Sequence, residues 1–442
     1  MSTSPFLPVE YSDGYLPLKD HGLIGDGATA ALVGRDGSIP WLCAPRFDSP
    51  PLFCGILDRE RGGTFTVAPE DLVQSRQSYE PDSGVLVTEM RGRSGVVRVT
   101  DALTLRSGAD LNEDAPAARA ELLRSVEVLG EPVRLRVTVD PRGGATAERR
   151  GDGMRLRCAS RPDLDLQLRA TVPLRGMRTT LDLEAGDRLS LVLRWGGGHH
   201  RHHPAAPDEI LQATLDVWRR WMRCFDYEGP REELVRRSAI TLKLLDHTES
   251  GALVAAPTSS LPEWIGGERN WDYRYAWIRD AAFSVYALRR IGLTSEAAGF
   301  LGWVLDAVER HGRPKVLYDL DGEKPQPERE DEKLEGYRRS APVRWGNGAD
   351  EQRQHDVFGE ILDCAYQWAR AARRSTRCSG RSSASSSRPP AGSGASRTTA
   401  SGRCAQQAAR SPTRRPSARS PSTAGRSWPN DSGSPPTRRV GG

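Results

Sequence analysis

The spacing of apolar residues changes once along this 442-residue chain and then disappears. Between about residues 22 and 195, apolar and polar residues alternate in short runs such as 84–90 and 133–139, separated by clusters of Asp, Gly and Pro. Many short strands divided by turns are typical of a β-sandwich. Residues 208–222 instead carry apolar side chains at helical spacing, and further helical stretches follow at 232–247, 280–291, 294–309 and 356–372. The pattern predicts a multi-domain β + α chain: a β-sandwich, a linker helix and then an α domain.

The C-terminal segment, residues 373–442, has a different composition. It contains no Leu, Ile, Met, Phe or Tyr, and Trp428 and Val440 are its only large apolar residues. Fourteen Arg face a single acid, Asp431, which gives the segment a net charge of +13, whereas the rest of the chain carries −8. Such a segment buries too little apolar surface to offset the entropy lost on ordering, so we expect it to be disordered. It is either a basic, nucleic-acid-binding tail or a stretch read out of frame.

The coding pattern of this tail favours the out-of-frame interpretation. Lysine is absent while Arg, Ser, Pro, Ala and Gly dominate, as expected when GC-rich DNA is translated in a displaced frame. Codons can be chosen for residues 396–405 that read, two bases along, as Pro-Asp-His-Gly-Ile-Trp-Glu-Val-Arg. Residues 409–433 give an amphipathic helical segment in the same way. We therefore expect a frameshift near Ala371, and a gene that resequences as one continuous frame would contradict it.

The densest group of reactive side chains is the run from Asn270 to Asp280. It holds four aromatic residues, two Arg and two Asp, and it leads directly into an apolar helical stretch. Aromatic faces stack on the C–H faces of a sugar ring, while carboxylates and guanidiniums form charge-assisted hydrogen bonds with its hydroxyls. A sugar-binding pocket built around a fixed Arg–Asp pair is one interpretation. The other is that the aromatics are core residues and the charges form a structural ion pair.

Three motifs in this chain resemble glycoside hydrolase family 15, which comprises glucoamylases, glucodextranases and bacterial trehalases. The first lies within residues 23–50, where Pro40 departs from the Asp usual in the family. The second is the Asn270–Asp280 run with the preceding Gly-Gly-Glu-Arg, and the third lies within residues 342–360. The motifs occur in the family's order, and the resemblance covers about residues 15–370.

The resemblance implies four segments. These are a trehalase-like N-terminal β-sandwich at residues 1–205, a linker helix at 206–228, the first part of an (α/α)6 glycosidase barrel at 229–371, and the tail at 372–442. Only about four of the twelve helices of such a barrel would be encoded, so their inner faces would lack partners. We therefore expect exposed apolar helix surfaces, poor solubility and a proteolytic fragment near residues 1–225.

By the resemblance, the run holds the sugar-binding half of an active site. Arg279 and Asp280 would hold hydroxyls of the sugar at the cleavage subsite, and Tyr273 and Trp277 would flank its ring. The third motif contributes three residues for which binding and structural roles are equally open: Arg344, Trp345 and Asn347. The first motif contributes three residues for which a contribution between the domains, mainly packing, is favoured: Trp41, Arg46 and Asp48.

Glycoside hydrolysis needs two carboxyl groups across the scissile bond, about 6.5–9.5 Å apart in an inverting enzyme. By the resemblance, the general acid is the Glu of the Trp-Glu pair that occurs only in the displaced frame, and the base lies further on. Both catalytic Glu would be absent from this chain, which is therefore predicted to be inactive. Glu335 and Glu360 are the available substitutes, but a solvated loop is favoured for residues 328–335 and a structural role for Glu360.

The resemblance implies an α-glucoside substrate such as trehalose, maltose or a malto- or isomalto-oligosaccharide, with no cofactor and no nucleic-acid partner. A histidine cluster follows the β region, and a solvated loop is favoured for it over a metal site because no carboxylate or thiol accompanies it: His199, His200, His202 and His203. A polar start and the lack of a long apolar run predict a cytoplasmic protein without membrane contact. The alternative is a non-catalytic glucan-binding or interaction protein with a basic nucleic-acid-binding tail.

Overall fold

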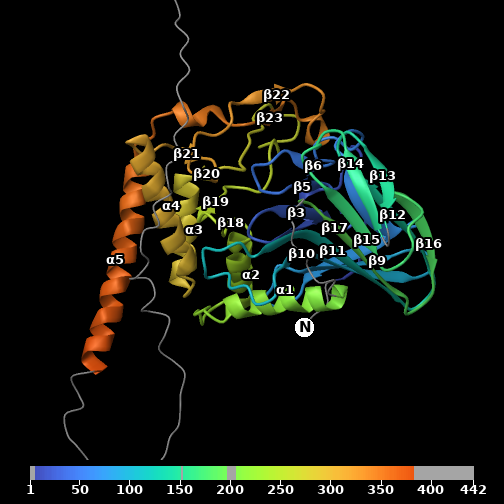
Figure 1. The fold of residues 1–442 in the computed structure, drawn as a ribbon, viewed down its shortest axis with the longest axis horizontal. Coiled ribbons are helices and arrows are strands. Elements are labelled where there is room, and N and C mark those ends of the chain that lie inside the picture. Colours follow the sequence, from blue (N-terminus) through green and yellow to red (C-terminus); the bar gives the residue numbers. More distant parts are fainter. Residues whose placement is uncertain (1–4, 151–152, 197–205, 383–442) are drawn as a thin grey trace, which may run out of the picture. The chain divides into compact units, whose positions relative to one another are not determined.

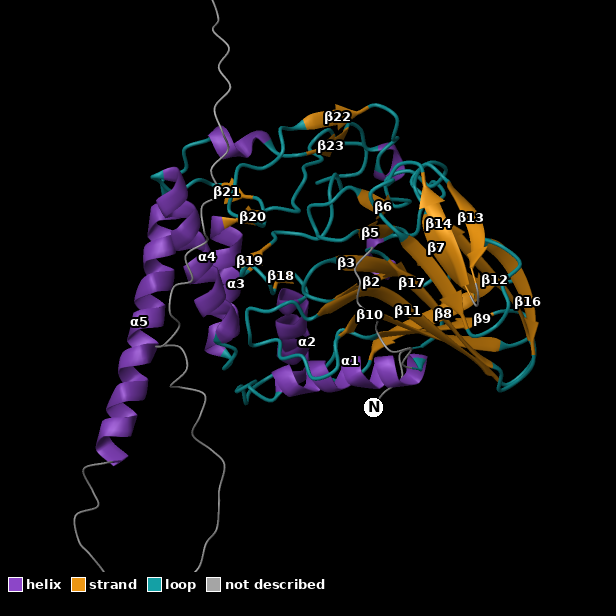
Figure 2. Ribbon diagram, in the orientation of Figure 1, coloured by secondary structure: helices purple, strands orange, loops and turns teal. Residues whose placement is uncertain are grey.

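The strands of the first half of the chain pair in three antiparallel sheets (Figures 1 and 2). The computed structural model describes residues 5–150, 153–196 and 206–382. One sheet has nine strands, in the order β1 (Leu7–Pro8), β8 (Gln74–Tyr79), β9 (Leu86–Arg91), β10 (Val96–Leu105), β11 (Ala118–Leu129), β17 (Arg188–Arg194), β15 (Leu166–Ala170), β14 (Gly153–Cys158) and β13 (Ala145–Arg150). A second has the order β16 (Arg178–Leu183), β12 (Val133–Asp140), β7 (Thr64–Pro69) and β4 (Ser38–Ile39). The third has the order β2 (His21–Gly25), β3 (Ala30–Gly34), β5 (Trp41–Cys43) and β6 (Pro51–Phe53).

Strand alternation places the main core of this β region. In β12, Leu135 and Val137 are buried while Arg134 and Arg136 between them are exposed, as period two requires. The buried side chains of β12 join those of β10, such as Val97 and Val99, in one apolar cluster. This cluster spans the nine-stranded sheet and the four-stranded sheet that contains β12. The sheet-rich first half predicted from the alternating pattern is confirmed.

Helix α1 (Pro207–Met222) follows the last strand of the β region and packs along β10 (Figure 1). Its Trp218 and Trp221 are buried, and the Thr214 hydroxyl accepts a hydrogen bond from the Leu105 amide at 3.1 Å. The helix predicted at residues 208–222 is therefore confirmed, and it connects the β region to the helices that follow.

Four further helices match the helical stretches expected from the sequence: α2 (Glu232–Lys243), α3 (Ile278–Arg290), α4 (Ser295–His311) and α5 (Asp356–Ser382). Val285 of α3, Phe300 of α4 and Val357 of α5 share one core. The expectation that α2 continues to residue 247 was wrong. The helix ends at Lys243, whose buried ammonium pairs with Asp246 at 2.7 Å and with Glu296 of α4 at 2.8 Å.

Short strand pairs and turns fill the segments between these helices. The pairs are β18 (Asp246–His247) with β19 (Ala252–Leu253), β20 (Ala276–Trp277) with β21 (Leu317–Tyr318), and β22 (Arg329–Asp331) with β23 (Val343–Trp345). Two short 3-10 turns, η2 (Tyr337–Arg339) and η3 (Gly348–Glu351), lie between α4 and α5, and a third, η1 (Leu18–Asp20), precedes β2. The segment 334–345 packs onto the β region through an apolar cluster that contains Trp41 and Trp345. The β region and helices thus belong to one compact unit that extends to Gly380.

Two expectations concern segments outside the described residues. The histidine cluster at 199–203 lies there, and so do residues 383–442 of the tail expected at 372–442. The disorder expected for the first residues of that tail was wrong, because helix α5, expected to end at 372, continues to Ser382. Within the described ranges, no group of three or more His, Cys, Asp or Glu side chains is placed to hold a metal ion. No helix in those ranges has the length and apolar character needed to cross a bilayer.

Asp26 is a fully buried carboxyl in the turn between β2 and β3. Its Oδ1 accepts hydrogen bonds from the Ala28 and Thr29 amides at 3.0 Å, while Oδ2 is buried without a hydrogen-bond partner among the described residues. Burial raises the pKa of Asp26 to about 6, against the opposing effect of the amides. Because this pKa exceeds the unfolded value, the folded state binds the proton more tightly. The resulting stabilisation is complete below the unfolded pKa and is lost as the pH rises through about 6.

We expect Asp26→Asn to raise the free energy of unfolding by about 1–3 kcal/mol at pH 8 and to change it much less at pH 4, where the native carboxyl is protonated. Urea unfolding at the two pH values measures the difference. Asp182→Asn is the matched control, because that side chain is 84% exposed. An equal effect of Asp26→Asn at both pH values would contradict the raised pKa.

Candidate functional site

The Asn270–Asp280 run divides into buried and accessible side chains. Asn270, Asp272, Arg274 and Tyr275 are each at most 3% exposed. Arg274 and Asp272 form a buried ion pair, with Nε to Oδ1 at 2.9 Å and Nη2 to Oδ2 at 2.7 Å. For these residues the structural interpretation of the motif is the one that fits.

The Asp272–Arg274 pair holds three segments together. Arg274 Nη1 donates to the Ser49 carbonyl at 2.7 Å, in the loop after β5. The Asp272 carboxylate accepts from the Gly346 amide at 3.0 Å, and the Asp272 carbonyl accepts from Asn347 Nδ2 at 2.9 Å. The first, second and third sequence motifs thus meet at one buried charge pair.

The accessible side chains of the run gather at the start of α3. Tyr273 and Trp277 are half-buried neighbours, with ring centroids 5.9 Å apart and ring planes inclined by 41°. Burial raises the pKa of Tyr273, and the nearby carboxylates of Glu263 and Asp280 raise it further. The Tyr273 hydroxyl therefore stays protonated and available as a hydrogen-bond donor.

Arg279 and Asp280 occupy the first turn of α3, but they do not form the fixed pair that the sequence suggested. Arg279 Nη1 donates to Gln354 Oε1 at 3.1 Å and pairs with Asp356, the first residue of α5, at 2.5 Å. Asp280 is exposed, and its carboxylate accepts no hydrogen bond from another side chain of the described residues. Burial raises the pKa of Asp280, while the Arg279 charge and the Asp280 amide oppose that rise.

This arrangement suits a cyclic, hydroxylated ligand. The Asp280 carboxylate can accept from two hydroxyls, and the Arg279 guanidinium retains donors beyond those that it gives to Gln354 and Asp356. The Tyr273 and Trp277 rings beside them offer apolar faces. The sequence predicted that one group contains Tyr273, Trp277, Arg279 and Asp280, and the structure places these four residues together at the start of α3.

The residues of the third motif have mostly structural contacts. Trp345 is 3% exposed, stacks on Trp41 with centroids 6.3 Å apart, and donates from Nε1 to Asp331 at 3.0 Å. Asn347 uses both ends of its amide, because Oδ1 caps η3 at the Ala349 amide and Nδ2 donates to Asp272. Between the binding and structural roles left open for these two residues, the contacts favour the structural one.

Arg344 also has several contacts within the protein. Its guanidinium donates to the Glu268 carbonyl at 2.6 Å and to Glu330 at 3.0 Å, and it lies 4.6 Å from the centre of the Trp271 ring. The contacts hold the loop before the run against the β22–β23 pair. These contacts favour a structural role for Arg344 over direct binding of a ligand.

The first-motif residues lie where the β region meets the helices. The Trp41 indole donates to the Pro257 carbonyl at 2.8 Å. Arg46 pairs with Asp48 at 2.7 Å and with Asp321, in the turn after β21, at 2.9 Å. His247 is close enough to this group that the Arg46 charge adds to burial in lowering its pKa to about 4. Trp41 and Arg46 therefore make direct contacts with segments that follow α2, whereas Asp48 contacts Arg46 of its own loop.

The two candidate substitutes for the missing carboxyls differ in position. Glu335 accepts a hydrogen bond from the Tyr15 hydroxyl. The solvated loop expected at 328–335 was wrong in part: Leu334 is buried, and Asp331 pairs with Arg142 at 2.7 Å. Glu360 lies one turn beyond Asp356 in α5, and burial, followed by the Asp356 and Asp363 charges, raises the pKa of its carboxyl.

Three residues near the site were not selected from the sequence for it. Gln354 and Asp356 hold Arg279, although they are 75 and 77 residues away along the chain. Trp264 is 71% exposed in the loop before the run, where the nearby Glu263 and Arg269 charges both act on Tyr273. In the sequence, a Trp that closely precedes the turn-forming pair Gly266-Gly267 could have identified this loop as one that presents an aromatic side chain to solvent.

Large apolar side chains are exposed on the faces of three helices: Phe283 and Tyr286 on α3, Leu305 on α4, and Phe358, Leu362, Tyr366 and Trp368 on α5. Each is at least 39% exposed. The expectation of unpartnered apolar helix surfaces is confirmed for the described residues.

Comparison with known proteins gives two family matches in chain order. Residues 11–163 match the trehalase-like N-terminal domain, and residues 229–385 match glycosyl hydrolases family 15. A trehalase of Mycolicibacterium smegmatis is 37% identical over 406 residues, which cover 82% of this chain and 60% of the relative. A trehalase of Thermoplasma volcanium is 35% identical over 380 residues, covering 82% and 59%. The chain thus spans about three-fifths of the length of these curated relatives.

Among solved structures, a bacterial glucoamylase complexed with acarbose superposes with a TM-score of 0.48 at 13% sequence identity, over 72% of this chain and 54% of that one.

Proposed function

Because this chain belongs to glycoside hydrolase family 15, we propose that the complete protein is an inverting α-glucosidase that hydrolyses trehalose. The observation that carries the proposal is the group at the start of α3, where the unpaired Asp280 carboxylate lies beside Arg279, Tyr273 and Trp277. The trehalase relatives favour trehalose over maltose and the longer α-glucans as the substrate.

In the proposed reaction, the described residues bind and orient the sugar. Asp280 accepts hydrogen bonds from hydroxyls of the glucose ring at the cleavage subsite, while Arg279, fixed by Asp356 and Gln354, donates to the same ring. Tyr273 and Trp277 flank the ring and keep its apolar faces from water. These groups raise the reaction rate by holding the ring in place relative to the acid and the base.

Bond cleavage is proposed to use two glutamates that residues 1–371 do not supply. One carboxylic acid protonates the oxygen between the sugars, and a carboxylate on the opposite face activates water, so that the configuration at the anomeric carbon inverts. We propose that the first part of an (α/α)6 barrel is formed by residues 229–371, and that helices encoded in the displaced frame cover the apolar faces of α3 and α5. Phe283, Leu362 and Tyr366 would then become core residues.

The test compares the 442-residue chain with the protein obtained when the reading frame of its gene is restored from about residue 371. Glucose released from trehalose, maltose and dextran is measured, and NMR gives the ratio of the anomers before they equilibrate. We expect the restored protein to release one β-glucose and one α-glucose from each trehalose, and the 442-residue chain to release no glucose. Turnover by the 442-residue chain would contradict the assignment of both catalytic groups to the missing frame. Sugar binding without turnover by the restored protein would favour a glucan-binding function instead.

A further inference from the structure

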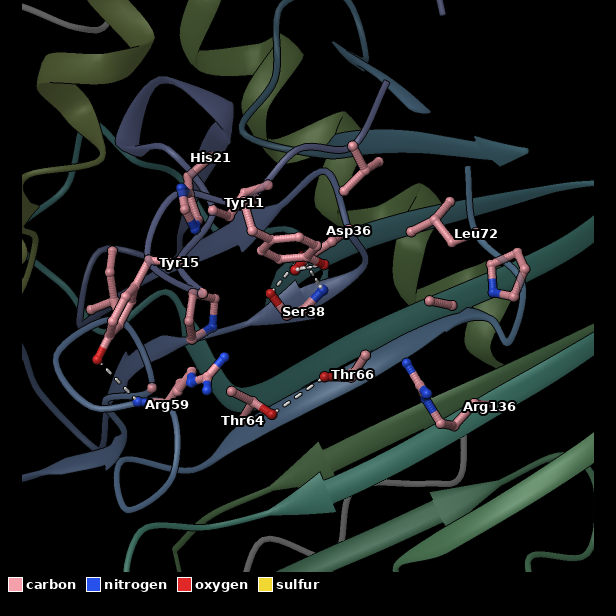
Figure 3. A pocket seen from close by; sticks show the side chains of 18 of the residues that line it. Tyr11, Tyr15, His21, Asp36, Ser38, Arg59, Thr64, Thr66, Leu72 and Arg136 are labelled. Atoms are coloured by element: carbon pink, nitrogen blue, oxygen red, sulfur yellow. Dashed lines mark hydrogen bonds between the residues drawn. The ribbon is translucent and has the colours of Figure 1, made fainter. Parts of the chain in front are cut away.

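A concave site lies on the β region, and none of the residues assigned to the candidate active site lines it. It is a cavity of about 360 Å³ (Figure 3). Its floor is the outer face of the four-stranded sheet, where Ser38 of β4, Thr64 and Thr66 of β7, and Arg136 of β12 lie side by side. Alternation puts these side chains outward, because Phe65 and Val67 between them point into the core.

The N-terminal segment turns this sheet face into a pocket. Tyr11 and Tyr15 form one wall, and Arg59 closes the end near Tyr15 (Figure 3). Contacts with the 335–339 segment fix the wall: the Tyr15 hydroxyl donates to Glu335, and Arg338 pairs with Asp13 at 2.9 Å. A volume of this size lies within the range of small-molecule sites in proteins, about 300–1,000 Å³.

The polar groups of the cavity offer both donors and acceptors. Asp36 accepts from the Tyr11 hydroxyl at 3.0 Å and from the Ser38 hydroxyl at 2.6 Å (Figure 3). The guanidiniums of Arg59 and Arg136 form no hydrogen bond or ion pair with any residue that the structure describes, although both line the cavity. Unused guanidinium donors that face a concave surface beside tyrosine rings are suited to bind a ligand.

The charged residues that line the cavity are of both signs. Arg59 and Arg136 line it together with Asp36 and Glu70, of which Glu70 also pairs with Arg134 at 3.1 Å, and burial lowers the pKa of His21, so this ring is neutral at physiological pH. An anionic ligand would meet two carboxylates as well as two guanidiniums. A neutral ligand with many hydroxyls would use both kinds of charge and also the threonine hydroxyls of β7.

We propose that this cavity is an accessory site for a neutral saccharide of one or two sugar units. The Tyr11 ring, which is 54% exposed, would face the C–H surface of a sugar, and Arg59 and Arg136 would donate to its hydroxyls. The site would hold a saccharide on the β region independently of hydrolysis at α3, and so it does not rest on the proposed function.

The experiment titrates the full chain with trehalose and maltose, followed by isothermal calorimetry and by saturation-transfer NMR. It is carried out in the Asp280→Ala background, so that the candidate active site does not contribute. We expect binding to remain in that background, and to weaken at least tenfold when Tyr11→Ala and Arg136→Ala are added. Both of these side chains are exposed, so the substitutions should leave the fold intact.

Arg178→Ala is the matched control, because Arg178 is an exposed Arg on β16, the strand that pairs with β12. It should not change saccharide binding. The proposal is overturned if the Asp280→Ala protein binds neither sugar, if the Tyr11→Ala and Arg136→Ala substitutions leave affinity unchanged, or if inorganic phosphate binds and displaces the sugars. Absence of trehalose hydrolysis by the restored-frame protein, with saccharide binding retained at this cavity, would contradict the proposed function alone.

Discussion

Replacing Asp280 by alanine in the restored-frame protein is expected to lower kcat/KM for trehalose by about 10²–10⁴-fold, because two charge-assisted hydrogen bonds of about 1.5–3 kcal/mol each are lost. Asp280 is exposed and has no side-chain partner among the described residues, so its removal leaves no buried group unpaired. The free energy of unfolding should therefore stay within about 0.5 kcal/mol of the parent value. Steady-state kinetics and urea unfolding of the same preparation test both halves of this prediction.

The control for Asp280 is Asp306→Ala, which removes an exposed carboxylate from α4. It should change neither kcat/KM nor stability. If Asp280→Ala keeps more than about a tenth of the parental kcat/KM, the carboxylate does not hold the reacting sugar, since a single lost charged hydrogen bond already costs a factor of ten or more. If Asp306→Ala is equally damaging, the effect belongs to net charge rather than to the site.

Local periodicity was sufficient to predict most of the elements, because burial on one side of a strand or helix leaves its period in the sequence. The strand at residues 133–139 is observed as β12 at Val133–Asp140, and the helix at 294–309 as α4 at Ser295–His311. The short strand pairs from β18 to β23 were missed. Two- and three-residue strands carry no readable period, and their pairing depends on contacts far along the chain.

The candidate site could be located from the sequence but its pairings could not. Two Arg and two Asp within Asn270–Asp280 allow several ion pairs, and composition does not rank them. The structure pairs Arg274 with Asp272 in the core, and it pairs Arg279 with Asp356, which belongs to a helix 77 residues away. The roles of the two arginines follow from tertiary contacts alone, which is why one motif contains both a structural pair and an open binding group.

The accessory cavity gave no signal in the sequence for a related reason. Thr64, Thr66 and Arg136 look like the ordinary exposed face of alternating strands. They become the floor of a cavity only because Tyr11 and its neighbours fold across that face. Concavity therefore arises from the path of the N-terminal segment, which has no regular period of its own.

The second large effect is expected for Arg274→Met, which should lower the free energy of unfolding by about 3–5 kcal/mol. The substitution removes a guanidinium of which only 4% is exposed and leaves the fully buried Asp272 carboxylate without its cation. The carbonyls of Phe47 and Ser49 lose their donor as well. A buried charge without a partner is costly, because the low-dielectric interior stabilises it neither as water would nor as the lost guanidinium did.

Arg279→Met is the matched control, since it makes the same change in the same motif. Arg279 and Asp356 are both more than 40% exposed, so their ion pair should contribute at most about 1 kcal/mol to stability. The two variants should therefore separate: Arg274→Met unfolds at lower urea concentration, whereas Arg279→Met keeps the parental midpoint but loses activity in the restored-frame protein. Equal loss of stability in both would show that Arg279 is structural, and an unchanged midpoint for Arg274→Met would contradict the assignment of Arg274 and Asp272 as the charge pair that holds the three motifs together. Adding Asp272→Asn to Arg274→Met sharpens the test, because neutralising the orphaned carboxylate should recover part of the lost stability only if its buried charge caused the loss.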